Sequence, residues 1–583
     1  MFKILKKMKW QDWCYALCCI AFIVTQVWLD MTMPQYMNEI TVLIETPGSA
    51  MSEVWRAGGM MLLCSLGSVA ASVITAIFAA RIGSDLSFAL RESLFKKVQS
   101  FSMEEIGRFS TASLITRSTN DIQQVLMFIV MGLQMLIKAP VTAVWAICKI
   151  SGQQWQWSMT TAIGVVIVLC TVGVCIKLVL PKVKRMQKLT DDLNRVTREN
   201  LNGLRVVRAY NAENYQEKKF DASNDELTRT QLFQQRTMSF MMPTMSLVQS
   251  GLMLAVYWIG AILMNDAADK IGLFGNMMVF SQYGIMIVMS FMMLVMPFMM
   301  LPRASVAAGR INEVLETEPT IHNGSLTEGV DGTVGEVEFR NVSFRYPDAE
   351  EDVISNISFT AKKGETVAFI GATGCGKTTV INLIPRFYDA TSGEVLVDGV
   401  NVKEYDEHAL RNKIAYVSQK ATLFSGTVSS NVAYGDNGRG QATADDIADA
   451  VGTAQAKDFV EGLHNKYDGY VAQGGANFSG GQKQRLSIAR AIARKAEIII
   501  FDDSFSALDY KTDRVLRKTL DEKCGDATRL IVAQRIGTIR DADKIIVLED
   551  GKAVGIGRHD ELMRDCEVYR QIALSQLSKE ELA

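Results

Sequence analysis

Histidine is scarce in this chain, and the spacings that hold metal ions are missing. The 583 residues include four histidines, His322, His408, His464 and His559, which are scattered along the sequence. No C-x-x-C pair stands with histidines in the pattern of a zinc site. We therefore expect no metal centre built from histidine and cysteine, and we expect the four histidines to lie at the surface.

An excess of positive charge is also missing. The net charge is −2 and the pI is about 6.2, so the chain lacks the basic field of a nucleic-acid-binding protein, and no nucleic-acid partner is expected.

The ten cysteines do not form a disulfide framework, because seven of them lie in or at the ends of long apolar runs. The other three, Cys375, Cys524 and Cys566, lie in the polar C-terminal half, where cytoplasmic thiols stay reduced.

Long apolar runs dominate the first half of the chain. The mean hydropathy of +0.11 is high for a chain with 21% charged residues, which fits an apolar part, residues 1–301, joined to a soluble α/β domain, residues 336–583. A helix needs about 20 apolar residues to cross a bilayer. Six runs qualify: Cys14–Met33, Trp55–Ala79, Val125–Cys148, Trp155–Leu180, Phe240–Met264 and Met277–Leu301. One such run fits a buried soluble helix, but six together favour spans in a lipid bilayer.

The positions of Lys and Arg predict the orientation of these spans. Lys3, Lys6, Lys7 and Lys9 precede the first run, and the loop at residues 34–54 has neither Lys nor Arg. The segments between runs two and three and between runs four and five are rich in both. Because cytoplasmic loops carry the excess of these residues, we expect both long segments and both termini in the cytoplasm of a multi-pass membrane protein. A signal peptide is the alternative for the first run, and its length argues against it.

A glycine-rich segment in the polar half predicts a phosphate-binding loop. Residues 371–378 have the G-x-x-x-x-G-K-T spacing, after an expected strand at Thr366–Ile370 and before a helix that begins near Lys377. In that context, backbone N–H groups and the helix N-terminus point at phosphate oxygens. Lys377 is expected to reach the β- and γ-phosphates, and the Thr378 hydroxyl to reach Mg²⁺. The expected contacts in this loop are Gly371, Thr373, Gly374, Cys375, Gly376, Lys377, Thr378 and Thr379.

Two further motifs follow about a hundred residues later. Phe478-Ser479-Gly480-Gly481-Gln482 comes first, and the apolar run Ile498–Phe501 then ends in Asp502-Asp503. With the phosphate loop, these motifs resemble the ATPase domain of ABC transporters. The resemblance covers nearly the whole chain and implies six transmembrane helices and an α/β P-loop nucleotide-binding domain. The expected boundaries are 1–315 for the transmembrane domain, 316–335 for a linker and 336–583 for the ATPase domain.

The long polar segments resemble the coupling regions of six-span ABC exporters. They are nearly free of Pro and Gly, so we expect helices that continue far past the membrane. Residues 109–121 resemble the first coupling region, and residues 198–210 the second. By that resemblance, a short helix near Leu204–Tyr210 docks on the ATPase domain of a partner subunit. The alternative is that both segments are plain linker helices.

The resemblance also implies roles for single residues. Tyr346 stands where the family has its adenine-stacking aromatic residue, and Gln419 matches the glutamine that touches Mg²⁺ and senses the γ-phosphate. Asp502 matches the carboxylate that holds Mg²⁺, so the expected metal ligands are Thr378, Gln419 and Asp502. Ser479, Gly480, Gly481 and Gln482 would complete the ATP site of the partner subunit. The cofactors implied are ATP and Mg²⁺.

Three positions depart from the family's pattern. Asp503 replaces the glutamate that polarises water, Gln534 replaces the switch histidine, and Gln473 stands where the family often has glutamate. The aspartate moves its carboxylate by roughly 1 Å, and misplacement on that scale can cost ~100-fold in rate. The pattern resembles bacterial heterodimeric multidrug exporters of the cell membrane, with one weak and one competent site. The alternatives are tolerated changes in a working homodimer and a regulatory subunit without turnover.

The cargo is less well specified. Met286, Met289, Met293, Met296 and Met300 recur on one face of the last span. Flexible thioethers suit small hydrophobic, drug-like substrates, but a stripe facing lipid or another helix fits equally, and a lipid or peptide cargo stays open. Lys138 lies within the third span, where a charge usually faces protein or a wet cavity, and we identify no acidic partner for it in the spans.

Overall fold

The structure is a computed structural model that describes residues 2–46, 48–152, 154–266 and 269–576. The ends of the expected domains, Met1 and residues 577–583, lie outside the described residues. The chain forms two compact units. The helical unit comprises residues 1–99 and 111–317, and the α/β unit comprises residues 100–110 and 318–583.

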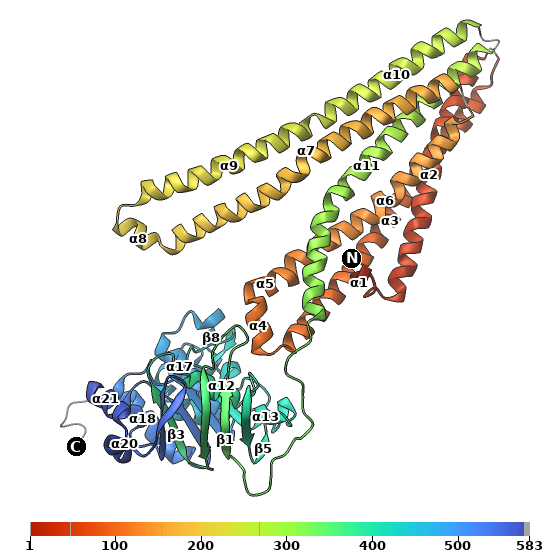
Figure 1. Cartoon of the computed structure of the whole chain (residues 1–583). Helices are drawn as coiled ribbons and strands as arrows, with labels where there is room; N and C mark the ends of the chain where they lie inside the picture. Colours follow the sequence, from red (N-terminus) through yellow and green to blue (C-terminus); the bar gives the residue numbers. More distant parts are fainter. Residues whose placement is uncertain (1, 47, 153, 267–268, 577–583) are drawn as a thin grey trace. The chain divides into compact units, whose positions relative to one another are not determined.

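Six helices of the described chain are long and apolar enough to cross a membrane, which confirms the six expected spans. Five lie in α2 (Trp10–Glu45), α3 (Met51–Gln99), α6 (Ile122–Ile150), α7 (Trp155–Asn202) and α11 (Lys270–Glu316) (Figure 1). Apart from Phe240, the run at Phe240–Met264 lies in α10 (Met241–Asp266), which follows α9 (Glu213–Ser239). α2 continues through Pro34 to Glu45, so much of the segment expected as a loop at residues 34–54 is helical.

The expected extensions beyond the apolar runs are present. α3 runs to Gln99 and α7 to Asn202 (Figure 1). α9 is rich in polar and charged residues along its length. The expected short helix is α8 (Leu204–Ala209), between α7 and α9. The remaining elements of the first 121 residues are α1 (Phe2–Leu5), α4 (Met103–Phe109), α5 (Thr111–Thr116) and a π-helical turn η1 (Arg117–Asp121).

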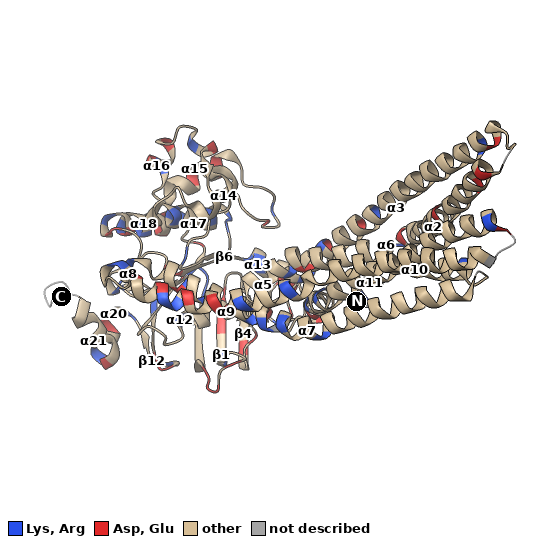
Figure 2. Cartoon of the chain, turned by 90° about the horizontal axis from the view of Figure 1, so that it is seen from above, with Lys and Arg blue, Asp and Glu red and all other residues tan. Residues whose placement is uncertain are grey.

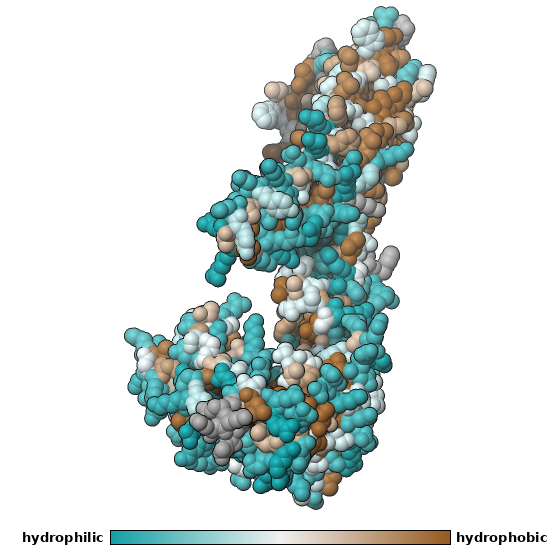
Figure 3. All heavy atoms as spheres, turned by 60° about the vertical axis from the view of Figure 1, so that its left-hand side comes forward, coloured by the Kyte–Doolittle hydropathy of each residue, from teal (hydrophilic) through white to brown (hydrophobic). Residues whose placement is uncertain are grey.

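The outer surface of the helical unit suits lipid. Leu62, Leu66 and Val69 of α3 are each about 60% exposed. Several large apolar side chains exposed together on one helix form a patch that is uncommon on a water-facing surface. Figure 3 shows hydrophobic residues concentrated on the helical unit and hydrophilic residues over much of the rest. Figure 2 shows α10 and the middle of α11 largely without charged residues. The exposed apolar faces are therefore consistent with burial in a bilayer.

The α/β unit is built on three sheets. The six-stranded sheet has the order β12-β11-β3-β10-β9-β6, parallel except for β12. Its strands are β3 (Thr366–Gly371), β6 (Ile414–Val417), β9 (Ile498–Asp502), β10 (Thr528–Val532), β11 (Lys544–Glu549) and β12 (Lys552–Gly557). An antiparallel sheet has the order β2-β1-β4-β5, from β1 (Val337–Phe344), β2 (Ile354–Ala361), β4 (Ser392–Val397) and β5 (Val400–Asn401). β7 (Gly426–Thr427) and β8 (Tyr470–Val471) form a two-stranded sheet.

β9 shows why an apolar run becomes the centre of this unit. All its residues are buried, as expected for a parallel strand covered on both faces. Successive side chains point to opposite faces, so Ile499 and Phe501 join one hydrophobic cluster while Ile498 and Ile500 join the other. The strand therefore delivers Asp502, its last residue, to the carboxyl edge of the sheet.

Ten α-helices and two 3₁₀ turns complete the described part of the α/β unit after residue 318. They are α12 (Lys377–Leu383), α13 (Glu407–Asn412), α14 (Val428–Val432), α15 (Ala444–Thr453), α16 (Lys457–Glu461), η2 (Lys466–Asp468), η3 (Gln473–Gly475), α17 (Gly480–Ala493), α18 (Tyr510–Lys523), α19 (Ile536–Ile539), α20 (His559–Asp565) and α21 (Glu567–Gln576).

The prediction that all four histidines lie at the surface is wrong for one of them. His559 is buried, with Nδ1 2.7 Å from the Tyr569 hydroxyl, and this burial lowers the pKa of His559.

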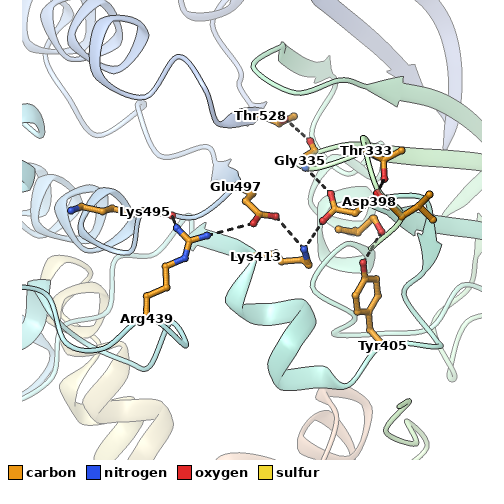
Figure 4. A network of polar contacts seen from close by, with 11 residues as sticks. Thr333, Gly335, Asp398, Tyr405, Lys413, Arg439, Lys495, Glu497 and Thr528 are labelled. Atoms are coloured by element: carbon orange, nitrogen blue, oxygen red, sulfur yellow. Dashed lines mark hydrogen bonds and ion pairs between the residues drawn. The ribbon is translucent and has the colours of Figure 1, made fainter. Parts of the chain in front are cut away.

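A polar network ties the segment before β1 to the sheets (Figure 4). The Gly335 N–H donates to Asp398 Oδ1 at 2.6 Å, and Lys413 Nζ donates to Asp398 Oδ2 at 2.6 Å. Lys413 also lies 3.3 Å from Glu497, which comes just before β9. Burial, with the Asp398 charge nearby, raises the pKa of Tyr405 to about 12, so its hydroxyl stays protonated and donates to the Val397 carbonyl. The network fixes the approach of the chain to β1.

Candidate functional site

The glycine-rich segment connects β3 to α12, as the sequence predicts. Gly371 and Gly376 have φ of +155° and +94°. A Cβ at Gly371 would lie 2.1 Å from the Leu548 carbonyl oxygen, and one at Gly376 would lie 2.5 Å from Ile354 Cγ2. Both positions therefore need glycine for space, which allows the loop to curl tightly over the first turn of α12.

Lys377 is held within this loop. Its Nζ donates to the carbonyl oxygens of Gly371 at 2.8 Å and Ala372 at 2.7 Å, and the residue is 8% exposed. Cys375 differs from expectation. Its place beside backbone amides and Lys377 in the glycine-rich loop predicts an accessible, reactive thiol, but the residue is 6% exposed and belongs to a hydrophobic cluster. The cause is the tight turn of the loop, which brings Cys375 Sγ close to Gly371. A Cβ on Gly371 would lie only 2.7 Å from this sulfur.

Two of the three expected metal ligands lie together. The Thr378 hydroxyl donates to Asp502 Oδ1 at 2.9 Å, and the Tyr416 hydroxyl lies 3.3 Å from Asp502 Oδ2. Burial is the main cause that raises the pKa of Asp502, and it also raises the pKa of Tyr416. Hard oxygens from a hydroxyl and a carboxylate are the ligands that Mg²⁺ prefers.

The third expected ligand, Gln419, lies against the neighbouring carboxylate. Its Nε2 donates to Asp503 Oδ2 at 3.2 Å, and Gln534 Nε2 donates to the same oxygen at 2.7 Å. Asp503 has a φ of +46°, which is uncommon for a residue other than glycine, and burial raises the pKa of its carboxyl. Two of the three departures from the family's pattern, Asp503 and Gln534, are therefore in direct contact.

A cavity of about 200 Å³ gathers most of the predicted residues. It is lined by Thr373, Gly374, Gly376, Lys377, Thr378, Thr379, Gln419, Asp502, Asp503 and Gln534, together with Val353 and Val532. Tyr346 lies beside it, with its hydroxyl 3.2 Å from Thr379 Oγ1 and its ring edge-to-face with Tyr388. Gly371, the last residue of β3, and the buried Cys375 do not line the cavity.

The residues Ser479, Gly480, Gly481 and Gln482 do not line this cavity and stand at the start of α17. Ser479 Oγ accepts the Gln482 N–H at 3.3 Å, and the Gln482 side chain accepts the Ser479 N–H at 2.9 Å. This reciprocal capping box fixes the helix N-terminus. A Cβ on Gly480 would meet nothing within 4 Å, so the space over Gly480 is open.

Besides Val353 and Val532, Tyr416 and Gln576 lie at the site and were not predicted from the sequence. Tyr416 precedes Gln419 by three residues, and its position near the end of the strand β6 was an available signal. Gln576 had no such signal, because it lies far along the chain. Its Nε2 donates to the Gln534 carbonyl at 2.8 Å, and its Oε1 accepts the Ile536 N–H at 2.8 Å. The end of α21 therefore holds the backbone on both sides of Arg535.

The family profile "ABC transporter transmembrane region" matches residues 16–291, and the profile "ABC transporter" matches residues 354–506. The chain is 38% identical to an uncharacterised ABC transporter ATP-binding protein of Mycobacterium tuberculosis over 521 residues, 89% of this chain and 87% of that protein. This chain is an ABC exporter half-transporter. It joins a transmembrane domain to an ATP-binding domain, and it belongs to the ABC transporter family.

Other relatives of the half-transporter span most of its length as well. It is 34% identical to the uncharacterised ABC transporter ATP-binding protein YfiB of Bacillus subtilis, over 90% of both chains. It is 32% identical to the ATP-dependent lipid A-core flippase of Pseudomonas fluorescens, over 85% of this chain and 81% of that protein. A solved bacterial Atm1-family ABC exporter with ATP bound has the same fold, with a TM-score of 0.79 and 22% identity over 97% of this chain and 99% of the other.

The expected fold class is confirmed by these matches. The half-transporter is a multi-pass membrane protein with six membrane helices and an α/β nucleotide-binding domain. As an ABC exporter half it works as a dimer, and its ATP-binding domain implies an ATPase coupled to transport, with Mg²⁺ as the usual companion of ATP.

Proposed function

We propose that this half-transporter binds MgATP at a site that hydrolyses it slowly, within a heterodimer whose partner carries the competent site. The observation that carries the proposal is the double hydrogen bond to one carboxylate oxygen. Gln419 and Gln534 both donate to Asp503 Oδ2, at 3.2 and 2.7 Å. An oxygen that accepts two amide N–H groups is poorly placed to accept a proton from water as well.

The residues present suit MgATP. Lys377 brings a positive charge to the glycine-rich loop, and Thr378 and Asp502 bring a hydroxyl and a carboxylate within 2.9 Å of each other. The start of α12 offers the free N–H groups of a helix N-terminus to phosphate oxygens. When bound, Mg²⁺ would neutralise phosphate charge between Thr378 and Asp502. We assign the adenine contact to Tyr346, beside Thr379, and a metal contact to Gln419 along with Thr378 and Asp502.

The proposed slow hydrolysis of ATP follows from Asp503, just after β9, and from Gln534, just after β10. Asp503 is one methylene shorter than glutamate, and its raised pKa shows that its buried position disfavours the charge. Gln534 supplies an amide in place of an imidazole, so it donates a hydrogen bond but cannot carry the positive charge of a protonated histidine. Asp503 and Gln534 together therefore orient one another and leave little capacity to activate water.

The partner's site would be completed by this chain. Ser479, Gly480, Gly481 and Gln482 form an intact helix N-terminus with open space over Gly480. A helix start with its N–H groups exposed favours phosphate, so we assign this segment to the nucleotide held by the partner subunit. We assign α8 and the adjoining Tyr210 to docking on the partner's ATP-binding domain, since Val206 of α8 and Tyr210 are both exposed.

We place the half-transporter in a bacterial cell membrane, with both termini and the long helix extensions in the cytoplasm. The cargo we propose is a small amphipathic or hydrophobic compound moved out of the cytoplasm or the inner leaflet. A lipid is the second candidate, because relatives with 30–32% identity are named lipid A-core flippases.

Steady-state ATPase of the purified homodimer in lipid nanodiscs tests the slow site. We expect nucleotide binding with turnover at least about 100-fold below that of the complex with its partner. The Lys377→Ala homodimer provides the background rate. Fast turnover by the homodimer, lost in Lys377→Ala, would falsify the proposal and support a working homodimer.

A further inference from the structure

A cavity lined by methionine lies within the helical unit. It has a volume of about 400 Å³ between α2, α3, α10 and α11, within the usual range of small-molecule sites. Its walls carry Met33, Met37, Met61, Met253, Met278 and Met286. Unbranched thioether side chains adjust to varied apolar shapes, so these walls accept a ligand without fixing one outline.

The methionine stripe expected on α11 contributes little to this cavity. Of its members, Met286 lines the cavity, whereas Met289 and Met296 are about half exposed on the surface of the helical unit. The methionines that gather here come from four helices. Periodicity along one helix could not reveal them.

One carboxylate faces this cavity. Among the described residues that line it, Asp30 is the only member of the group Asp, Glu, Lys, Arg and His. Asp30 Oδ1 accepts the Ser68 hydroxyl at 2.5 Å, and Oδ2 lies 3.6 Å from Lys138 Nζ. The expectation that Lys138 has no acidic partner in the spans is therefore wrong. Asp30 lies in α2 and Lys138 in α6, and no local sequence pattern relates residues on two different helices.

The pair presents its negative end to the cavity. Lys138 does not line the cavity, and the separation of 3.6 Å from Asp30 is longer than a direct hydrogen bond. Asp30 therefore keeps acceptor capacity on the side of the cavity, where the apolar methionine walls lower the local dielectric and strengthen attraction to a positive charge. An ionisable residue inside a membrane helix is costly, and such residues usually face a functional cavity.

We propose that this cavity binds a membrane-soluble organic cation. The positive charge lies at Asp30, and the apolar body lies against the methionines, with Gln282 and Tyr257 as further polar contacts on the wall. Lys138 is the competing counter-ion, which neutralises Asp30 when the ligand leaves. This inference rests on the proposed exporter function and narrows its substrate class.

Equilibrium dialysis with radiolabelled tetraphenylphosphonium tests the inference. The full-length chain is used in lipid nanodiscs without nucleotide, and empty nanodiscs give the background. Tetraphenylborate has the same four phenyl groups and the opposite charge. We expect saturable binding of the phosphonium and none of the borate. Tighter binding of the borate would overturn the proposal.

Substitutions at the ion pair separate a charge effect from a folding defect. Asp30→Asn should weaken phosphonium binding by about tenfold or more, because the variant loses the charge interaction with the ligand. A tenfold loss of affinity corresponds to about 1.4 kcal/mol. Lys138→Met should strengthen it, because the competing cation is gone. The double variant Asp30→Asn/Lys138→Met leaves no unpaired charge, so it should fold normally and bind as weakly as Asp30→Asn. Unchanged phosphonium affinity in a folded Asp30→Asn or double variant would refute the site.

The failure of this inference is distinguishable from failure of the slow-site proposal. The dialysis assay contains no nucleotide and reads no hydrolysis. Absent phosphonium binding with slow homodimer turnover removes only the cation site, whereas fast homodimer turnover with intact binding removes only the slow-site assignment.

Discussion

Gln534 donates its side-chain amide to Oδ2 of Asp503 across 2.7 Å. The contact joins the two positions that depart most clearly from the pattern of active ABC ATPases. The amide of Gln419 reaches the same oxygen, so the carboxylate that would face water is engaged twice. Asp503, Gln419 and Gln534 come from three separate loops but meet at this one oxygen. Since they are coupled there, we expect substitutions at the three positions to have unequal effects.

Restoring the glutamate alone should help little. Asp503→Glu lengthens the side chain, but Gln534 still lacks an imidazole, so we expect homodimer turnover to rise by less than about tenfold. The double variant Asp503→Glu/Gln534→His should raise homodimer turnover by about 10- to 100-fold, measured as steady-state ATPase in nanodiscs. Adding Lys377→Ala to the double variant is the control and should return the rate to background. A full gain from Asp503→Glu alone would contradict the coupled assignment.

Gly480→Asp should nearly abolish ATPase in the complex with the partner. A carboxylate at this helix start would face the partner's nucleotide, and repulsion of like charges at about 4 Å costs ~4 kcal/mol near a protein surface, enough for a loss of about 100-fold or more. The substitution fits this chain, because a Cβ there would meet nothing within 4 Å. Gly452, on α15, also has open space, so Gly452→Asp is the matched control and should keep the rate. Full activity in Gly480→Asp would disprove the assignment across the dimer.

Cys375 should react slowly with a maleimide, with or without MgATP. Its thiol packs beneath Gly371 and is nearly inaccessible, whereas Cys524 is only partly buried. Mass spectrometry of the labelled full-length protein should show Cys524 modified at least about tenfold sooner, since labelling of Cys375 requires local opening of the loop. Fast labelling of Cys375 that MgATP suppresses would instead indicate an open loop.

Asp502→Asn should stabilise the nucleotide-free protein more as the pH rises. Burial raises the pKa of Asp502 above its ordinary value of 3.8, so the stability it contributes is present at low pH and lost as the pH rises through the folded pKa. We expect little difference in Tm near about pH 4 and a higher Tm for the variant by about pH 8, by ~2–4 °C for each kcal/mol.

Asp509→Asn provides the opposite case for the same measurement. Hydrogen bonds from Thr512 lower the pKa of Asp509, so its contribution is lost only as the pH falls below the ordinary range of aspartate. Its effect on Tm should therefore stay constant between about pH 4 and about pH 8. A pH-independent effect of Asp502→Asn would show that the buried charge has no cost.

Local patterns in the sequence determined much of this protein. The six apolar runs, the strand and helix around residues 371–378 and the capped start of α17 all follow from residues close together in the chain. So does the hairpin of β4 and β5, where Asp398 and Gly399 have φ of +52° and +74°, as its two-residue turn requires. Such elements are predictable because hydrogen bonding and steric limits act over a few residues.

The packing of distant elements decided the rest. It buried Cys375 and His559, and it brought Lys138 to Asp30 from a different helix. It also placed Gln576 of the last described helix against the backbone of Gln534. Each of these contacts joins segments that no local pattern relates. Their geometry depends on how whole helices and sheets pack, and only the tertiary structure fixes it.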